Sequence, residues 1–410
     1  MTITLVSILM VVTPQVAETL MFVYSADAYC LAMLLAVLAV YYIYKENSLK
    51  NNILAISFIV LTLSLYQAYI SVIVSLCILL PIINLIQGED WKNILKIVGK
   101  SLTIGIVGMI LYYGITLLIL KLSNNGFSIY GGANNIGVST IQNLIPETLN
   151  TYKTFYKYFF REDLIYNEFW RRDIINFIIA IITIVNIICI IIKNKTYKKY
   201  NNIMLLCLFI IILPIGINII NIIAPDRDNN LVMGMSYVLI YVLVLKIIDI
   251  LDCEKEYKIL KSISQVFLSI IIVTFVLSNN ASYMARKEVY NNYYSTSMRI
   301  LTKIENYGNY NENTPVLIGG IIKHSPNIAK LGNGFISNDY ETWNNYSGIE
   351  MINKFFHNYM GMTINLCNKT DYEKIVKSEE YKNMSIFPYD ECIKMIDGIL
   401  VVKIEDSPAI

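Results

Sequence analysis

The sequence contains few charged residues and almost no histidine. Of 410 residues, 16% are Asp, Glu, Lys or Arg, and the histidines are His324 and His357. A soluble domain is usually closer to a quarter charged, so this chain has too few charges to wet the surface of an ordinary water-soluble protein. Two histidines also give no support to a zinc protease or to a histidine-rich metal site.

Familiar nucleotide-binding and hydrolase motifs are missing as well. Gly99-Lys100-Ser101 matches the end of a phosphate-binding loop, but Ile94 stands where that motif needs its first glycine. The sequence has no Gly-x-Ser-x-Gly elbow and no Gly-x-Gly-x-x-Gly fingerprint. A net charge of +2 gives no indication of nucleic-acid binding. Any chemistry is therefore expected to use carboxylates, arginines and tyrosines near the outer membrane face.

What the chain does contain is long apolar segments. It is 55% hydrophobic with a mean hydropathy of +0.52, and a membrane helix needs about 20 apolar residues. The stretch Ile53–Ile86 would be about 50 Å long as one helix, so we expect a break near Ser64–Gln67 that makes two segments. The other expected segments are 3–23, 27–44, 101–120, 173–192, 203–223, 231–250 and 263–279. The first has no basic lead-in and contains Pro14 and Glu18, so it is interpreted as a polar-interrupted span and not as a signal peptide.

The fold class predicted is a polytopic α-helical membrane protein with about nine hydrophobic segments, followed by a small extracytoplasmic α/β domain. The expected domains are residues 1–279, with an outer loop 121–172, and residues 280–410. Lysines in the short link Lys193–Lys199, and near residues 92–100 and 246–261, indicate the cytoplasmic side. In the outer domain we expect a helix over 283–305 and buried strands at 315–318 and 399–403.

Only two of the seven cysteines, Cys367 and Cys392, fall in the predicted outer domain, where oxidation can occur. A disulfide between them is one hypothesis, and two small buried thiols are the alternative.

Ionisable and polar residues inside apolar segments are candidates for function, because burying them in lipid is costly. Glu18 follows Pro14, which can break the helix and open a polar cavity; a structural carboxylate is the alternative. Asp27 begins the next span and is either functional or the cap of that helix. Tyr66 and Gln67 stand at the expected break, where they bind substrate or join helices.

Two outer loops carry further candidates. Arg227 in Pro225–Asp228 can clamp a lipid phosphate, and Asp226 and Asp228 are weak candidates for a divalent cation; a solvated turn is the alternative. In the loop 121–172, apolar residues from Ile141 to Phe159 have helical spacing with lysines between them. This pattern predicts an amphipathic helix in the headgroup layer, which either covers an active site or only anchors the chain. Arg171 and Arg172 follow Trp170 at the interface and are candidate substrate-binding residues.

Three parts of the chain resemble bacterial type-two O-antigen (Gtr) membrane glucosyltransferases. They are Pro14–Glu18 with Asp27 and the Ala/Leu-rich span after it, the run Leu63–Ser71, and the ending Ser385–Lys403. The similarity is spread over most of the chain, but each motif is short. The abundance of Ile, Asn, Lys and Tyr is typical of an AT-rich bacterial genome.

The resemblance implies an inverting enzyme of the GT-C superfamily in the bacterial cytoplasmic membrane. Such an enzyme moves a hexose, typically glucose, from a polyprenyl-phosphate donor to a surface glycan acceptor on the outer face. For such a reaction, our hypothesis gives Glu18 or Asp27 the acid/base or cavity role, Arg227 the phosphate, and Tyr66 and Gln67 the sugar. Family members usually begin with further helices and an acidic outer loop, so this chain is expected to start after that region.

Two other functions are compatible with the sequence. One is another lipid-linked glycan enzyme, a polymerase or ligase, which differs in acceptor and product. The other is a flippase or transporter, in which Glu18 and broken helices would line a permeation path. The expected partners are membrane lipid, the lipid-linked donor and the glycan, without nucleic acid and with no cofactor beyond a candidate divalent cation.

Overall fold

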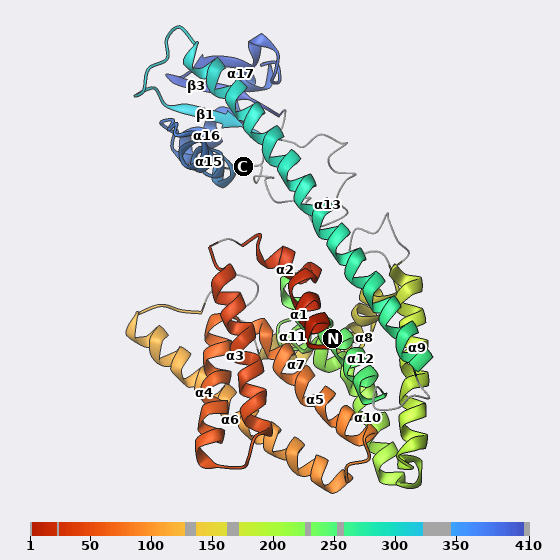
Figure 1. Ribbon diagram of the computed structural model, residues 1–410. Helices are drawn as coiled ribbons and strands as arrows, with labels where there is room; N and C mark the ends of the chain where they lie inside the picture. Colours follow the sequence, from red (N-terminus) through yellow and green to blue (C-terminus); the bar gives the residue numbers. More distant parts are fainter. Residues whose placement is uncertain are drawn as a thin grey trace. The chain divides into compact units, whose positions relative to one another are not determined.

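The computed structural model describes residues 2–22, 24–127, 137–161, 172–225, 231–251, 258–322 and 346–405. The described chain is mostly helical (Figure 1). It divides into two compact units, residues 1–279 and 280–410.

The prediction of a polytopic helical membrane protein is confirmed. Seven described helical segments are long and apolar enough to cross a membrane, and two shorter apolar helices bring the hydrophobic segments described to nine (7 + 2). In the first unit the helices are α1 (Thr2–Val12), α2 (Pro14–Thr19), α3 (Ala26–Tyr44), α4 (Leu49–Leu65), η1 (Gln67–Tyr69), α5 (Ile70–Ile86), α6 (Trp91–Leu122), α7 (Val138–Gln142), α8 (Leu144–Phe160), α9 (Arg172–Lys193), η4 (Thr196–Lys198), α10 (Tyr200–Ile217), α11 (Ile219–Ile223), η5 (Leu231–Tyr237) and α12 (Val238–Leu251).

Several of the apolar segments are broken. Thr13 is extended and Pro14 takes the first position of α2, where its missing N–H costs nothing. The expected single segment 3–23 is therefore corrected to two short helices. At the break between them, the side-chain amide of Asn279 donates to the Val12 carbonyl over 2.8 Å. The break predicted near Ser64–Gln67 is confirmed, because α4 ends at Leu65 and Tyr66 is extended.

The remaining helices pack closely. α3, α4 and α6 lie side by side, and α5 packs against α10 (Figure 1). A Cβ atom at Gly216 of α10 would lie 2.4 Å from the Ile78 side chain, so a glycine is needed where α10 meets α5. α6 is mostly exposed along its apolar length, as expected for a helix that faces lipid.

Two links that the sequence predicts to be cytoplasmic are hydrogen-bonded to each other. Asn202 and Lys199 donate to the Glu89 and Gly88 carbonyls, each over 2.6 Å, and Asn194 donates to Ile86 over 3.2 Å. These contacts place the α5–α6 and α9–α10 links at the same end of the unit. Their position on the cytoplasmic side stays a prediction.

The second unit is built on a small sheet. The long helix α13 (Lys258–Glu305) includes the expected helix 283–305. Strands β1 (Val316–Gly319), β2 (Ile393–Ile396) and β3 (Ile399–Lys403) form a sheet in the order β1-β3-β2, with β1 parallel and β2 antiparallel to β3. Both predicted strands are present, and the sequence reading missed only β2, which is partly exposed and thus less apolar.

Short helices surround the sheet (Figure 1). They are α15 (Tyr346–Phe355), the π-helix η7 (Phe356–Met360), α16 (Lys369–Val376), α17 (Glu379–Lys382) and η8 (Asp390–Cys392). Their apolar side chains and those of α13 form one core with the strands. Cys367 and Cys392 are buried and no disulfide joins them, so the alternative of two buried thiols describes the structure and the disulfide hypothesis does not.

Candidate functional site

Broken helices meet inside the first unit. α2 packs against η5, and η1 also contacts η5, so the break after α1 and the break after α4 lie near the same 3-10 helix. η5 itself is kinked at Gly234. Irregular backbone inside a membrane protein must find partners within the protein or line a polar cavity, so this region is the first place to look for a site.

Gln15 on α2 connects this region to α8. Its side chain is fully buried, and its amide donates to the Tyr158 hydroxyl over 2.8 Å. The Thr13 hydroxyl donates to the Gln15 side-chain oxygen, and Thr19 donates to the Gln15 backbone carbonyl over 2.8 Å. The side-chain oxygen and the side-chain nitrogen of Gln15 therefore each have a partner, the hydroxyls of Thr13 and Tyr158.

An aromatic pair extends the network to η5 and α10. The rings of Tyr158 and Tyr237 are stacked, with centroids 3.9 Å apart and planes 9° from parallel. The Tyr237 hydroxyl donates to the side-chain oxygen of Asn218, at the break between α10 and α11, and Asn218 donates to the Thr151 carbonyl over 3.2 Å. One connected polar network thus spans α2, α8, α10 and η5.

Arg172, the first residue of α9, lies at the edge of this network. Its Nη2 donates to the Tyr158 carbonyl over 2.7 Å, and its guanidinium lies 5.2 Å from the centre of the Tyr158 ring. That carbonyl is one of the last in α8, where the helix has no partner of its own and the dipole favours a cation. Asn176, one turn later, donates to the Phe159 carbonyl over 2.8 Å and accepts from Tyr241.

Arg172 is buried, and two of its side-chain nitrogens are unsatisfied among the described residues. The side chain is 1% exposed, yet Nε and Nη1 have no hydrogen-bond partner among the described residues. Burying an ion without a counter-ion costs on the order of several kcal/mol, and unmade hydrogen bonds add about 1–3 kcal/mol each. An anion bound at Nε and Nη1 would remove both costs, and phosphate oxygens suit the planar fork of guanidinium nitrogens.

The two candidate carboxylates differ in surroundings. Glu18 is half-buried on α2, one turn after Gln15, so it belongs to the same short helix as the buried network. Asp27 is exposed in the first turn of α3 and accepts from its neighbour Ala28 over 2.8 Å. The alternative that Asp27 is the N-cap of α3 is wrong, because α3 begins at Ala26 and its N-cap residue is Ser25.

Tyr66 and Gln67 lie among aromatic rings. The Tyr66 ring is 4.3 Å from that of Tyr29 and 4.9 Å from that of Tyr69. The exposed Gln67 amide donates to the Tyr112 hydroxyl on α6, so it joins two helices in this structure. Tyr69 lies against the Thr19 hydroxyl of α2, which brings this cluster next to the network of Gln15.

Four candidates lie outside the described residues: Arg171, Asp226, Arg227 and Asp228. Within the described ranges, no group of three or more His, Cys, Asp or Glu has the arrangement of a metal site. The divalent cation therefore stays a sequence prediction attached to Asp226 and Asp228.

Tyr158, Tyr237 and Asn218 were not among the sequence candidates. Tyr158 lies within the predicted amphipathic helix, and Tyr237 and Asn218 lie within predicted apolar segments, but the sequence pattern distinguishes none of the three. Their contacts join segments up to 143 residues apart, so one-dimensional spacing gave no signal for them.

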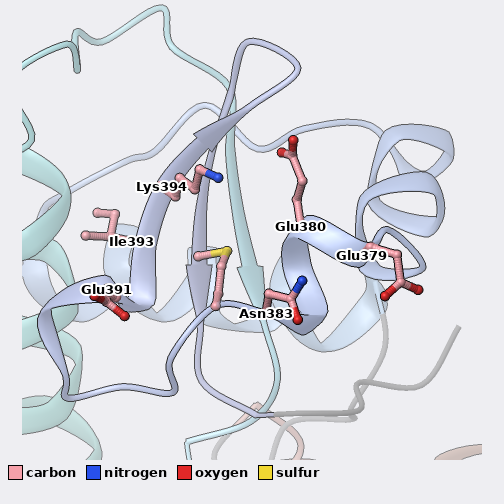
Figure 2. A pocket seen from close by; sticks show the side chains of 7 residues that line it. Glu379, Glu380, Asn383, Glu391, Ile393 and Lys394 are labelled. Atoms are coloured by element: carbon pink, nitrogen blue, oxygen red, sulfur yellow. The ribbon is translucent and has the colours of Figure 1, made fainter.

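The second unit has a hollow of its own. It has a volume of about 490 Å³ and is lined by charged side chains over an apolar floor (Figure 2). The lining residues are Glu379, Glu380, Asn383, Met384, Glu391, Ile393 and Lys394. Glu379 pairs with Lys382 at 2.6 Å and Glu391 accepts from Ser385. Two of its carboxylates, those of Glu379 and Glu391, thus have partners at the surface, in contrast to Nε and Nη1 of Arg172.

The fold and this network define a membrane protein with a buried cationic site among broken helices. A family model described as glucosyl transferase GtrII matches residues 1–247. The chain therefore belongs to the GtrII glucosyl transferase family, as its motifs indicated. The match covers α1 to η5 and α12 as far as residue 247, and thus all residues of the network, and the ending Ser385–Lys403 lies beyond it. Comparison with curated proteins and with solved structures gives no match.

Proposed function

We propose that the protein transfers a hexose, glucose in the first instance, from a polyprenyl-phosphate donor to a surface glycan on the outer face of the bacterial cytoplasmic membrane. Membership of a glucosyl transferase family supports sugar transfer over the transporter alternative. The observation that carries the choice of donor is the buried Arg172 with two unfilled donors, because a lipid-linked phosphate reaches such a site from within the membrane. Its C-terminal domain is then extracytoplasmic.

In this proposal Arg172 binds the phosphate of the donor. The donor phosphodiester carries one negative charge, and the phosphate that leaves carries nearly two. A fixed, buried guanidinium stabilises the leaving phosphate more than the donor phosphodiester. Arg172 therefore lowers the barrier to transfer in addition to binding the substrate. Arg171 and Arg227 are proposed to assist at the same phosphate.

Glu18 is the proposed base. It takes the proton from the acceptor hydroxyl while that oxygen attacks the anomeric carbon. The bond from this carbon to the phosphate oxygen breaks, and the electron pair leaves with the polyprenyl phosphate. Glu18 is preferred to Asp27 because it shares α2 with Gln15, whereas Asp27 is exposed. The rings of Tyr66, Tyr29 and Tyr69 are proposed to hold the hexose, with Gln67 beside them.

The test is transfer of labelled glucose by the purified 410-residue chain in vesicles that contain acceptor glycan. Polyprenyl-phosphate glucose is expected to support transfer and a nucleotide-linked glucose is not. Glu18→Gln is expected to lower the rate by about 10²–10⁴-fold, the usual contribution of a general base, with little change in donor binding. Asp27→Asn is the matched control and should keep the rate within about threefold. Equal losses in both variants, or transfer from the nucleotide donor alone, would overturn the assignment.

A further inference from the structure

Helix α8 presents three different faces, and only one of them packs against the protein. The packed face carries Thr151, Tyr158 and Phe159, all buried against α9, α10 and α11. A second face is apolar yet exposed: Ile145 is 75%, Leu149 67%, Tyr152 36% and Tyr156 56% accessible. These residues are three or four positions apart, so they form one continuous row along the helix.

The third face is basic. Lys153 and Lys157 are one turn apart, and Arg161 is the C-cap residue of α8. Lys153 and Arg161 are exposed, Lys157 is half-buried, and none of the three forms an ion pair with a described residue. The acidic residue of the helix, Glu147, accepts a hydrogen bond from Asn150 over 2.9 Å instead. The basic row therefore has its positive charge available.

A hydrogen bond connects the apolar row with the exposed apolar surface of α10. The Tyr152 hydroxyl donates to the Ile211 carbonyl on α10 over 2.8 Å. α10 is one of the membrane-spanning helices, and Leu208, Ile210 and Ile211 are exposed on it. The apolar row of α8 thus continues the lipid-facing surface of α10.

We propose that α8 lies in the headgroup layer of the membrane and that its basic row binds the phosphate groups of anionic phospholipids. An apolar row next to a row of lysines is the pattern of a helix at the interface, where tyrosines are also enriched and lysines extend their charge towards the headgroups. α8 holds Tyr158 on its packed face, so bound lipid fixes the helix that carries the stacked ring and the carbonyl bonded to Arg172. This inference does not depend on the reaction that the protein catalyses.

The experiment uses the full chain in vesicles with a tryptophan at position 149. The fluorescence added by Leu149→Trp is measured against the parent chain, with phospholipids brominated either near the glycerol or near the chain end. We expect stronger quenching by the shallow bromines for Leu149→Trp and by the deep bromines for Ile110→Trp, an exposed position within the span of α6. Quenching of the tryptophan at 149 by neither lipid, or more by the deep one, would overturn the location.

Headgroup recognition is tested with the same probe. At equal mole fraction, brominated phosphatidylglycerol is expected to quench the tryptophan at 149 about two- to fivefold more than brominated phosphatidylcholine, since each basic residue near the surface contributes roughly 1 kcal/mol before screening. Lys153→Gln with Lys157→Gln should reduce this ratio to about one and leave the phosphatidylcholine quenching unchanged. The matched control is Lys92→Gln with Lys96→Gln, an exposed pair of the same spacing on α6. A ratio that both pairs of substitutions leave unchanged would contradict lipid binding by the basic row.

Discussion

Among the described residues, each unit contains one fully buried cation, and the two cations have opposite surroundings. Lys403 on β3 is 1% exposed, and its Nζ donates to the Lys382 and Met384 carbonyls, each over 2.9 Å, and lies 5.3 Å from the centre of the Tyr381 ring. Arg172 is equally buried, but only one of its three nitrogens has a partner among the described residues. Burial alone therefore does not separate a structural charge from a functional one.

The surroundings of Lys403 are built to hold it. The Tyr381 hydroxyl donates to the Gly319 carbonyl over 3.1 Å, with the Glu405 carbonyl 3.0 Å away. A Cβ atom at Gly319 would lie 2.2 Å from that hydroxyl, so the glycine is needed for the ring to reach its place over Lys403. At Arg172, by contrast, rigid neighbours leave two donors open. A site that has evolved to bind an anion is expected to keep such donors.

The largest effect is expected from Arg172→Gln. Without the guanidinium, transfer should fall by about 10²–10³-fold, the usual cost of losing a donor to a charged transition state. The unfolding temperature should not fall, because the substitution removes a buried charge with two nitrogens that are unsatisfied among the described residues. Transfer and thermal unfolding would be measured on the same preparation. A clear loss of stability together with unchanged transfer by the folded fraction would make Arg172 a structural residue like Lys403.

Lys403→Met is expected to lower stability and to leave the rate of transfer unchanged, the reverse of Arg172→Gln. The apolar side chain fits the core, but it leaves the Lys382 and Met384 carbonyls without their donor, at about 1–3 kcal/mol each. Urea unfolding of the full chain, followed by protease cleavage within residues 280–410, should show a lower free energy of unfolding, while transfer per folded molecule stays near that of the parent. Lys394→Met, at an exposed lysine on β2, is the control and should change stability by less than about 0.5 kcal/mol.

The sequence predicted the membrane unit well because lipid imposes strong rules. Length and hydropathy alone locate the spans. The break at Pro14 follows from the missing N–H of proline. The break at Tyr66 follows because the apolar segment around it is too long for one crossing. Arg172 was found as a charge next to a span. Nothing in the sequence indicated that it would be buried with open donors, because that depends on where Tyr158 and the end of α8 lie in space.

The other half of the site could not be predicted for the same reason. Gln15 was one polar residue in a motif, and only the fold pairs it with Tyr158, 143 positions away. Lys403 was read as the last residue of a strand, which is correct, but a lysine there is usually exposed. Lys403 can be buried because its Nζ donates to the carbonyls of Lys382 and Met384, at the end of α17 and just after it. The alternation of residues along the strand gives no sign of these carbonyls.

A smaller effect is expected from Tyr158→Phe. The ring still stacks on Tyr237, but the Gln15 amide loses its buried partner. A lost hydrogen bond of this kind is worth about 0.5–1.5 kcal/mol, so transfer should fall roughly two- to tenfold with little change in stability. Tyr156→Phe, on the exposed row of α8, is the matched control and should have no effect on transfer. Similar losses in both variants would mean that the network around Arg172 is not specific.

The smallest effect on stability is expected from two neutral groups buried in the second unit, the thiols of Cys367 and Cys392. They extend the comparison of buried side chains to groups without charge. Burial raises the pKa of Cys367 to about 11 and, with a smaller contribution from Asp390, raises that of Cys392. A raised thiol pKa means that the folded state holds the proton more tightly, so the stability contributed by Cys367 is present below about pH 9 and is lost as the pH rises through about 11. Alkylation at pH 8 should therefore be much slower at Cys367 and Cys392 in the folded chain than after unfolding, and mass spectrometry of the modified peptides measures both rates. Rapid alkylation in the folded chain would show that the core of this unit opens readily. The hydrogen bonds of Lys403 would then hold it less firmly than the structure indicates, and the contrast between Lys403 and Arg172 would be weaker.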